Sequence, residues 1–266
     1  MAQTKKAPAA EKSLVVQEDK IKDLTSLMVE EGAEEHLSQE ELELPFLRVA
    51  QKGSPQVDED NPVFVDGLKP GLFFSTVSGS IFGDEVVVQV HGYFRNFIIW
   101  KGEKGAGSYS GVMTPEEYRE FESKNQLNRD GGDMVQIVDG EEIRYTDTRN
   151  FIVTLPEHPE EGIMIYPLSS TGVKVSKKWN SFNTGRRING RPTKRYATLW
   201  TLKTGAFESN GFLYKQVASI KPLGWATPDL VAYGKDFEGF AESIRKQGVR
   251  YSEPQGDSEA AEASNF

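Results

Sequence analysis

The feature that most constrains this chain is a succession of short segments rich in β-branched and aromatic residues. They are PGLFFSTVSG, EVVVQV, GYFRNFIIW, RNFIVTL, GIMIYPL, YATLWTL and LYKQVASI. Residues of these types favour β-strands. Turn-forming residues separate the segments at intervals of about 8–15 residues, which is typical of antiparallel sheets and not of βαβ units. The sequence therefore predicts a mainly β fold, an antiparallel barrel or sandwich.

Two dipeptides predict tight hairpins within this fold. Asp139-Gly140 lies inside MVQIVDGEEIRYT, and Asn210-Gly211 lies inside AFESNGFLYKQV. Both pairs suit the two-residue turns that join antiparallel strands.

Two segments have helical signals and would be insertions or additions to the sheet. In TPEEYREFESK, Thr114 is the expected N-cap, Pro115 the first helical residue and Glu117 the partner in a capping box. A last helix is predicted around ATPDLVAYGKDFEGFAESIRKQG. Its apolar face would consist of Phe237, Phe240, Ala241 and Ile244.

The charge of the chain is concentrated at its two ends. Residues 1–44 hold five basic and eleven acidic side chains, and residues 251–266 hold four acids and no base. The remaining residues 45–250 hold 26 bases and 25 acids. We expect three parts: an acidic, partly helical or disordered arm (1–44), a β-rich nucleic-acid-binding domain (45–250) and a disordered acidic tail (251–266).

One segment of the central part contains only basic charges. No acid occurs between Glu161 and Glu208, and the bases there are Lys174, Lys177, Lys178, Arg186, Arg187, Arg191, Lys194, Arg195 and Lys203. The interleaved aromatic residues are Trp179, Phe182, Tyr196 and Trp200. Bases neutralise phosphates and aromatic faces stack on unpaired nucleobases. Asparagine, glycine and proline predict a loop at the centre, and the whole predicts a single-stranded nucleic-acid site.

The alternative is a solvated basic hairpin whose tryptophans fill the core, since tryptophan on a strand is usually buried. Within the segment, Trp200 in YATLWTL is the residue we expect in the core. Trp179, flanked by Lys178 and Asn180, is the one we expect to be exposed.

A second candidate region is HGYFRNFIIWKGEKGAGSYSG. Its candidate nucleic-acid-binding residues are Arg95, Trp100, Lys101 and Lys104. The piece GEKGAGS does not satisfy the GxxxxGK[ST] pattern of a phosphate-binding loop, so an NTPase is not predicted.

The chain carries few residues suited to catalysis. It has no cysteine, its three histidines have no metal-ligand spacing, and no nucleophile motif occurs. We expect no enzyme activity, no cofactor and no metal. An alternative that stays open is a magnesium-dependent nuclease using Asp58 and Asp60. No apolar run reaches the ~20 residues of a membrane span, and no signal peptide is seen, so we expect no membrane association.

The last residues, GDSEAAEASNF, combine acids with a phenylalanine that the segment itself cannot bury. The expected partner-binding residues are Asp257, Glu259, Glu262 and Phe266. The acids could occupy the basic site when no DNA is present, and the ring could fill a pocket on a partner protein.

This arrangement resembles the single-stranded DNA-binding proteins of bacteriophages and bacteria, in which an oligonucleotide-binding (OB) barrel precedes an acidic tail ending in phenylalanine. LPFLRVAQKGSPQV followed by GLKPGLFFSTVSG is also similar to phage early-region proteins of that role, over about residues 44–100. The resemblance implies an OB-fold-like barrel with inserted helices and a C-terminal helix, working in the cytoplasm of an infected bacterium. It also implies roles in DNA replication, recombination and repair. The partners implied are single-stranded DNA and a phage DNA polymerase, primase/helicase or recombination nuclease. Whether the chain forms a homo-oligomer stays open. The main rival is a virion or scaffold protein.

Overall fold

The structure is a computed structural model that describes residues 44–102, 108–209 and 212–247. Contacts between Cα atoms divide the chain after Leu42, and all described residues belong to the second unit, Glu43–Phe266. The predicted acidic arm, apart from Leu44, and the predicted acidic tail lie outside the described residues. The predicted division into three parts therefore stays a prediction.

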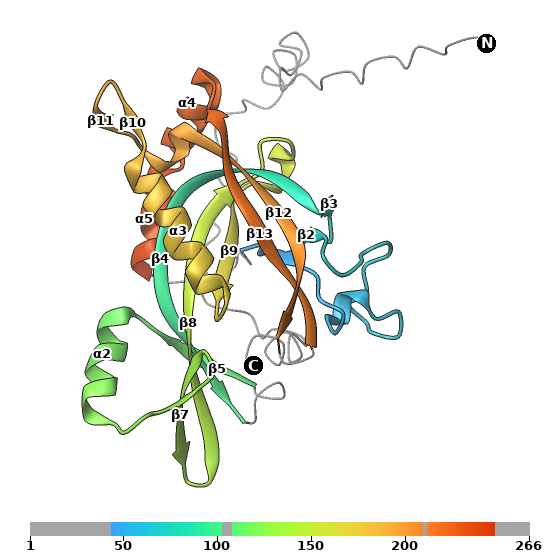
Figure 1. Ribbon diagram of the computed structural model, residues 1–266, viewed down its shortest axis with the longest axis vertical. Coiled ribbons are helices and arrows are strands. Elements are labelled where there is room, and N and C mark those ends of the chain that lie inside the picture. The colour runs from blue at the N-terminus through green and yellow to red at the C-terminus, as the bar shows by residue number, and fades with distance from the viewer. Residues whose placement is uncertain (1–43, 103–107, 210–211, 248–266) are drawn as a thin grey trace, which may run out of the picture. The chain divides into compact units, whose positions relative to one another are not determined.

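An eight-stranded antiparallel sheet forms the centre of the described unit (Figure 1). The order along it is β13-β12-β4-β8-β7-β6, with β5 also paired to β4 and β9 to β8. The strands are β4 (Glu85–Lys101), β5 (Ser108–Met113), β6 (Asn128–Asp130), β7 (Asp133–Val138), β8 (Glu141–Thr154), β9 (Met164–Ser169), β12 (Thr198–Ser209) and β13 (Phe212–Trp225).

Two smaller sheets accompany it. A three-stranded sheet contains β1 (Leu47–Val49), β2 (Phe73–Ser75) and β3 (Ile81–Gly83), and a two-stranded hairpin contains β10 (Arg187–Ile188) and β11 (Arg191–Pro192). Short 3₁₀ turns occur at η1 (Pro55–Val57), η2 (Pro159–Glu161) and η3 (Arg195–Ala197).

The large sheet curls into a half-barrel, and β-bulges explain much of the curl. The register shifts between Val90 and Gly92 in the β4–β8 pair, and between Lys203 and Thr204 in the β12–β13 pair. A bulge adds one unpaired residue, bends its strand and increases the local twist. The predicted mainly β, barrel-like class is therefore confirmed. The predicted strands EVVVQV and GYFRNFIIW are one strand, β4, because the bulge at His91 bends the chain without ending the pairing.

Both predicted hairpins form. Asp139 and Gly140 have φ angles of 52° and 82°, as a tight turn between β7 and β8 requires. Ser209 pairs with Phe212, so β12 and β13 are joined by the second hairpin. Its turn residues, 210–211, lie outside the described residues.

The helices are α2 (Pro115–Lys124), α3 (Gly172–Gly185), α4 (Pro228–Asp236) and α5 (Glu238–Gln247). Helix α2 begins with the predicted capping box: the Glu117 amide donates to Thr114 Oγ1 (3.2 Å), and the Thr114 amide donates to Glu117 Oε2 (2.7 Å). The predicted last helix is in fact two helices that meet at Phe237. Its apolar face is as predicted, since Ala241 and Ile244 are buried.

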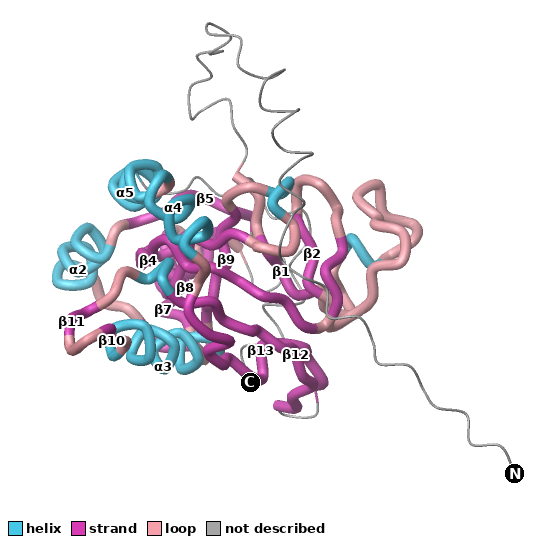
Figure 2. Tube along the Cα trace, turned by 90° about the horizontal axis from the view of Figure 1, so that it is seen from above, coloured by secondary structure: helices cyan, strands magenta, loops and turns pink. Residues whose placement is uncertain are grey.

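Helices cover both faces of the sheet. Phe151 of β8 and Trp179 of α3 belong to the same buried cluster. We call the face of the sheet to which Phe151 points the inner face. The neighbouring Ile152 points to the opposite, outer face and packs with Ala241 and Ile244 of α5. Figure 2 shows α3 and the α4–α5 pair on opposite sides of the strands. Gly92 leaves room for the Ile152 side chain under α5, because a Cβ there would lie 2.9 Å from Ile152 Cδ1 and 3.6 Å from Ala241 Cβ.

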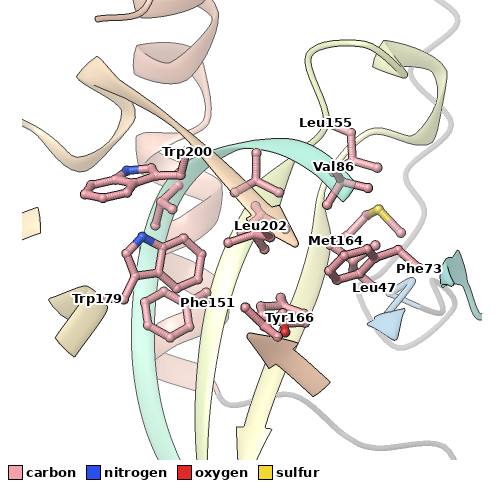
Figure 3. Packing of buried hydrophobic residues seen from close by; sticks show 14 of the residues in the cluster. Leu47, Phe73, Val86, Phe151, Leu155, Met164, Tyr166, Trp179, Trp200 and Leu202 are labelled. Atoms are coloured by element: carbon pink, nitrogen blue, oxygen red, sulfur yellow. The ribbon is translucent and has the colours of Figure 1, made fainter. Parts of the chain in front are cut away.

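Aromatic rings form the centre of the inner-face core. The Trp179 ring stacks on Phe151 with centroids 4.1 Å apart, and it meets the Trp200 ring edge-on at 6.2 Å. In Figure 3 the Trp179 ring lies between Trp200 and Phe151. Both tryptophans are 0% exposed. Helix α3 is therefore fixed to the sheet by an aromatic contact.

Two buried polar residues of β4 position the elements that follow α3. Gln89 Nε2 donates to the backbone oxygens of Tyr196 (2.8 Å) and Leu230 (2.7 Å), which ties η3 and α4 to the sheet. His91 lies beside them, with its Nε2 2.8 Å from Thr154 Oγ1 and its ring 5.6 Å from that of Phe237. Burial lowers the pKa of His91 to about 4.

We therefore expect His91 to make the fold acid-sensitive. The folded chain binds this proton less readily than the unfolded chain, whose histidine keeps a pKa of 6.5. Stability is retained above pH 6.5 and is lost as the pH falls toward 4, by about 3 kcal/mol in all. Denaturant unfolding across pH 4–7.5 should show this loss in the wild type, and a smaller loss in His91→Gln. Parallel profiles for the two proteins would contradict the assignment.

Candidate nucleic-acid interface

Helix α3 presents one buried and one basic side. Its buried positions are Gly172, Ser176, Trp179 and Asn183, which recur at helical spacing. The exposed bases on its other positions are Lys174, Lys177 and Lys178. The expectation that Trp179 is exposed is wrong. In a helix the adjacent residues point about 100° away, so polar neighbours such as Lys178 say nothing about the direction of the ring.

Phe182 is the exposed aromatic residue of this helix. Its side chain is 42% exposed. The ring lies parallel to Trp200, with centroids 6.4 Å apart, and Lys178 Nζ lies 5.7 Å above it. The expectation that Trp200 belongs to the core is confirmed. Phe182 thus rests on the core with a face available at the surface beside a cation.

After α3 the chain forms the small β10–β11 hairpin, in which Asn189 and Gly190 adopt positive φ angles of 50° and 77°. Arg187 and Arg191 are exposed on it. The predicted central loop is therefore correct for this hairpin and wrong for Asn180, Asn183 and Gly185, which lie in α3.

Arg186 contacts Trp225, the last residue of the edge strand β13. Its guanidinium carbon lies 4.2 Å from the centroid of Trp225, and its Nε donates to Thr198 Oγ1 at 3.3 Å. Trp225 is 45% exposed. Trp225 is not among the residues expected from the sequence, because it ends a strand with no neighbouring cluster of bases.

Three other residues of the basic segment are less available for binding nucleic acid than expected. Lys194 forms an ion pair with Glu238 at 2.6 Å, which holds the pKa of the lysine above its usual value. Lys203 pairs with Glu85 at 3.0 Å. Tyr196 is buried next to Gly234, so the expectation that its ring stacks on bases is wrong.

Of the seven remaining bases, all but Arg195 form what we call the basic ridge. It consists of α3 and the β10–β11 hairpin, and its cations are Lys174, Lys177, Lys178, Arg186, Arg187 and Arg191. Within the part of the chain that the structure describes, none of these six forms an ion pair with a carboxylate. Arg187 donates to the backbone oxygens of Thr184 (2.6 Å) and Arg186 (3.0 Å). The ridge therefore carries unneutralised positive charge beside Phe182 and Trp225.

The second predicted region does not join the ridge. Trp100 is partly buried on the outer face, 6.3 Å from Tyr109, in the cluster that α5 covers. Lys101 is exposed at the last position of β4, about 25 Å along the strand from Tyr93, which contacts the basic segment. Lys104 lies outside the described residues.

Arg95 and Arg195 instead meet in a group that sequence inspection did not assemble, the inner-face arginine cluster. Its members are Tyr93, Arg95, Asp147, Arg149 and Arg195. Arg95 and Arg149 are direct cross-strand partners, and Asp147 bridges them, at 2.7 Å from Arg95 Nε and 2.7 Å from Arg149 Nη2. Arg195 lies 5.6 Å from the Tyr93 ring. The sequence signal that could have indicated part of this cluster is the alternation of Asp147, Arg149 and Phe151 along one face of β8.

Among the described residues, no group of three or more histidine and acidic side chains is placed to hold a metal ion. Asp58 and Asp60 lie in an exposed turn, in which the Asp60 amide donates to Asp58 Oδ1 at 3.2 Å. None of the helices described is long and apolar enough to cross a membrane.

Comparison with protein families identifies the origin of the chain. The model of a family described as Pam3 phage gp34-like protein matches residues 16–249. The chain belongs to this phage family. The match spans the whole sheet, the basic ridge and the arginine cluster, so these are features of a phage gp34-like protein. Comparison with curated proteins and with solved structures gave no match.

Burial distinguishes the two aromatic residues of α3, and their replacement should show it. Trp179→Ala removes a fully buried ring and should lower the free energy of unfolding by about 3–5 kcal/mol. Phe182→Ala, at a surface position on the same helix, should lower it by less than about 1 kcal/mol. Denaturant titration followed by circular dichroism measures both. Equal losses for the two variants would contradict the packing of α3 described here.

Proposed function

We propose that this phage protein binds single-stranded DNA along the basic ridge, without catalysing a reaction on it. Such binding would protect the strand during phage DNA replication, recombination or repair in the cytoplasm of the infected bacterium. The observation that carries the proposal is the set of six ridge cations without carboxylate partners in the described chain.

The distribution of ion pairs supports this choice. Several other bases of the sheet and helices are paired with acids, as Arg144 is with Asp130 and Glu142, and Lys124 is with Glu120. A run of unmatched cations attracts a polyanion and gains affinity from the counterions that the polyanion releases. The ridge is therefore suited to the phosphates of a nucleic acid.

The exposed rings favour a single strand over a duplex. Phe182 and Trp225 each border a ridge cation, and each has a substantial exposed fraction. Unpaired bases can stack on such rings, whereas the bases of a duplex are already stacked on each other. Stacking of this kind depends little on sequence, so the proposed binding is sequence-tolerant.

Binding of labelled oligo-dT would distinguish two other functions from the proposed one. A virion or scaffold protein would bind labelled oligo-dT weakly or not at all, while assembling through its charged ends. A nuclease that uses Asp58 and Asp60 would degrade the strand when magnesium is added. No specific contact in the described residues favours either one.

The ridge lysines should determine how binding responds to salt. Neutralising three of them in K174Q/K177Q/K178Q should weaken oligo-dT binding and reduce the slope of log K against log salt by about 2, or about 0.7 for each lost phosphate contact. Fluorescence anisotropy at several salt concentrations measures the slope.

The matched control is K52Q/K69Q/K124Q, which removes the same charge from exposed positions outside the ridge and should leave the slope nearly unchanged. Phe182→Leu should lower affinity about tenfold at every salt concentration, because stacking releases no counterions. Equal slopes for the ridge and control variants would place the strand elsewhere on the protein.

The acidic segment 251–266 is proposed to compete with DNA and to recruit a replication or recombination enzyme. Deleting residues 252–266 removes Glu253, Asp257, Glu259 and Glu262. The shortened protein should bind oligo-dT more tightly, most clearly at low salt where charges are least screened. Removing Phe266 alone should leave DNA affinity near that of the wild type while weakening capture of a phage polymerase or nuclease. Unchanged DNA affinity after the larger deletion would refute the competition, and unchanged capture without Phe266 would refute the recruitment.

A further inference from the structure

The inner-face arginine cluster contains one cation whose charge is not compensated within the described chain. Arg195 is partly buried, and its Nη1 donates to Asn180 Oδ1 of α3 at 2.8 Å. Its other neighbour is the Tyr93 ring, 5.6 Å from the guanidinium carbon. No carboxylate pairs with it in the part of the chain that the structure describes. Removing a cation from water is unfavourable unless an anion compensates it.

Arg149, on the other side of Tyr93, has the compensation that Arg195 lacks. Burial disfavours its charged form, but its hydrogen bonds to the Tyr93 hydroxyl (3.2 Å) and to Asp147 (2.7 Å) keep its pKa above the usual value. Burial of Arg195 has no comparable compensation and lowers its pKa. The difference between the two arginines is that Asp147 pairs with Arg149, whereas no carboxylate of the described residues pairs with Arg195.

The net charge of the cluster would favour the binding of such an anion. Arg95, Arg149 and Arg195 contribute three positive charges, and Asp147 contributes one negative charge. Asp147 already accepts hydrogen bonds from two of the arginines, through both of its oxygens. Arg149 Nε is buried without a hydrogen-bond partner in the structure as described. Arg149 and Arg195 both contact Tyr93, in a cluster whose described charges sum to +2.

Guanidinium groups recognise phosphate because their planar array of N–H donors matches two phosphate oxygens at once. Helices flank the cluster at both ends. Asn180 of α3 holds Arg195, and Phe97, the ring under Arg95, stacks on Tyr118 of α2 at 3.6 Å. The donors are thus held on rigid elements. The three lysines of the ridge lack this planar array of donors.

We propose that a phosphate group binds beside Tyr93, between Arg149 and Arg195. Its source can be the backbone of the strand held on the ridge or a free phosphate. Only the first of these rests on the proposed function. Asn180 lies on the same helix as the ridge lysines, so a strand on α3 would have this site at the border of its path.

Thermal unfolding of the full chain in inorganic phosphate and in chloride, at equal ionic strength, tests the site without DNA. Phosphate should raise the unfolding temperature of the wild type by several degrees. Arg195→Gln should abolish this shift, Arg195→Lys should retain part of it, and Arg119→Gln, which removes an exposed arginine paired with Glu116, should retain all of it. In chloride Arg195→Gln should unfold at or above the wild-type temperature, because it removes an uncompensated cation. Absence of a phosphate-specific shift in the wild type, or an equal shift in Arg195→Gln, would overturn the proposal.

Oligo-dT binding then identifies the source of the phosphate. If the strand supplies it, Arg195→Gln should reduce the salt slope by about 0.7, as one phosphate contact is lost. An unchanged slope together with the thermal shift in phosphate would support the site and assign it to a free phosphate. If the wild type binds no oligo-dT at all, the proposed function fails, while the thermal shift still decides whether the site exists.

Discussion

The packing of Trp179 between Phe151 and Trp200 determines where the basic charges of this protein lie. The ring is the part of α3 that enters the inner-face core, and it orients the helix so that Lys174, Lys177 and Lys178 face outward. A second attachment follows α3 in the chain, where Gln89 holds the backbone of Tyr196. The β10–β11 hairpin lies between these two attachments. The basic segment is therefore fixed to the sheet at both ends, and only its arginine-bearing hairpin extends away.

The ridge cations differ in their partners from the paired bases of the sheet. Arg144 is paired with acids and contributes to the packing of the sheet. The ridge cations have no such partners among the described residues, and the three lysines repel one another along one face of α3. Like charges so placed destabilise a helix slightly, and an anion would remove this cost. Burial of Trp179 supplies enough free energy for the helix to tolerate this repulsion.

Sequence inspection predicted the sheet well because its signals are local. Period-two apolar segments and the Asp139-Gly140 turn specify strands and a hairpin without reference to the rest of the chain. Trp179 was misplaced because the segment KVSKKWNSFNTG has weak helix formers, and its helix is stabilised by tertiary packing on Phe151. The arginine cluster could not be assembled because it depends on the register that sets Arg95 opposite Arg149. Residues 54 positions apart in the sequence give no local sign of that contact.

The ridge and the arginine cluster differ in the physics by which they would hold a phosphate. The ridge cations are surrounded by water, so their attraction falls steeply as salt rises. Arg149 and Arg195 are partly buried, where screening is weaker and a hydrogen bond to an anion is stronger. The exposed ridge cations would attract a strand from a distance, and the partly buried Arg149 and Arg195 would hold one phosphate in a fixed position. Because Asn180 lies on the same helix as the ridge lysines, a strand held by both groups would have a fixed register on α3 without any contact that reads its bases.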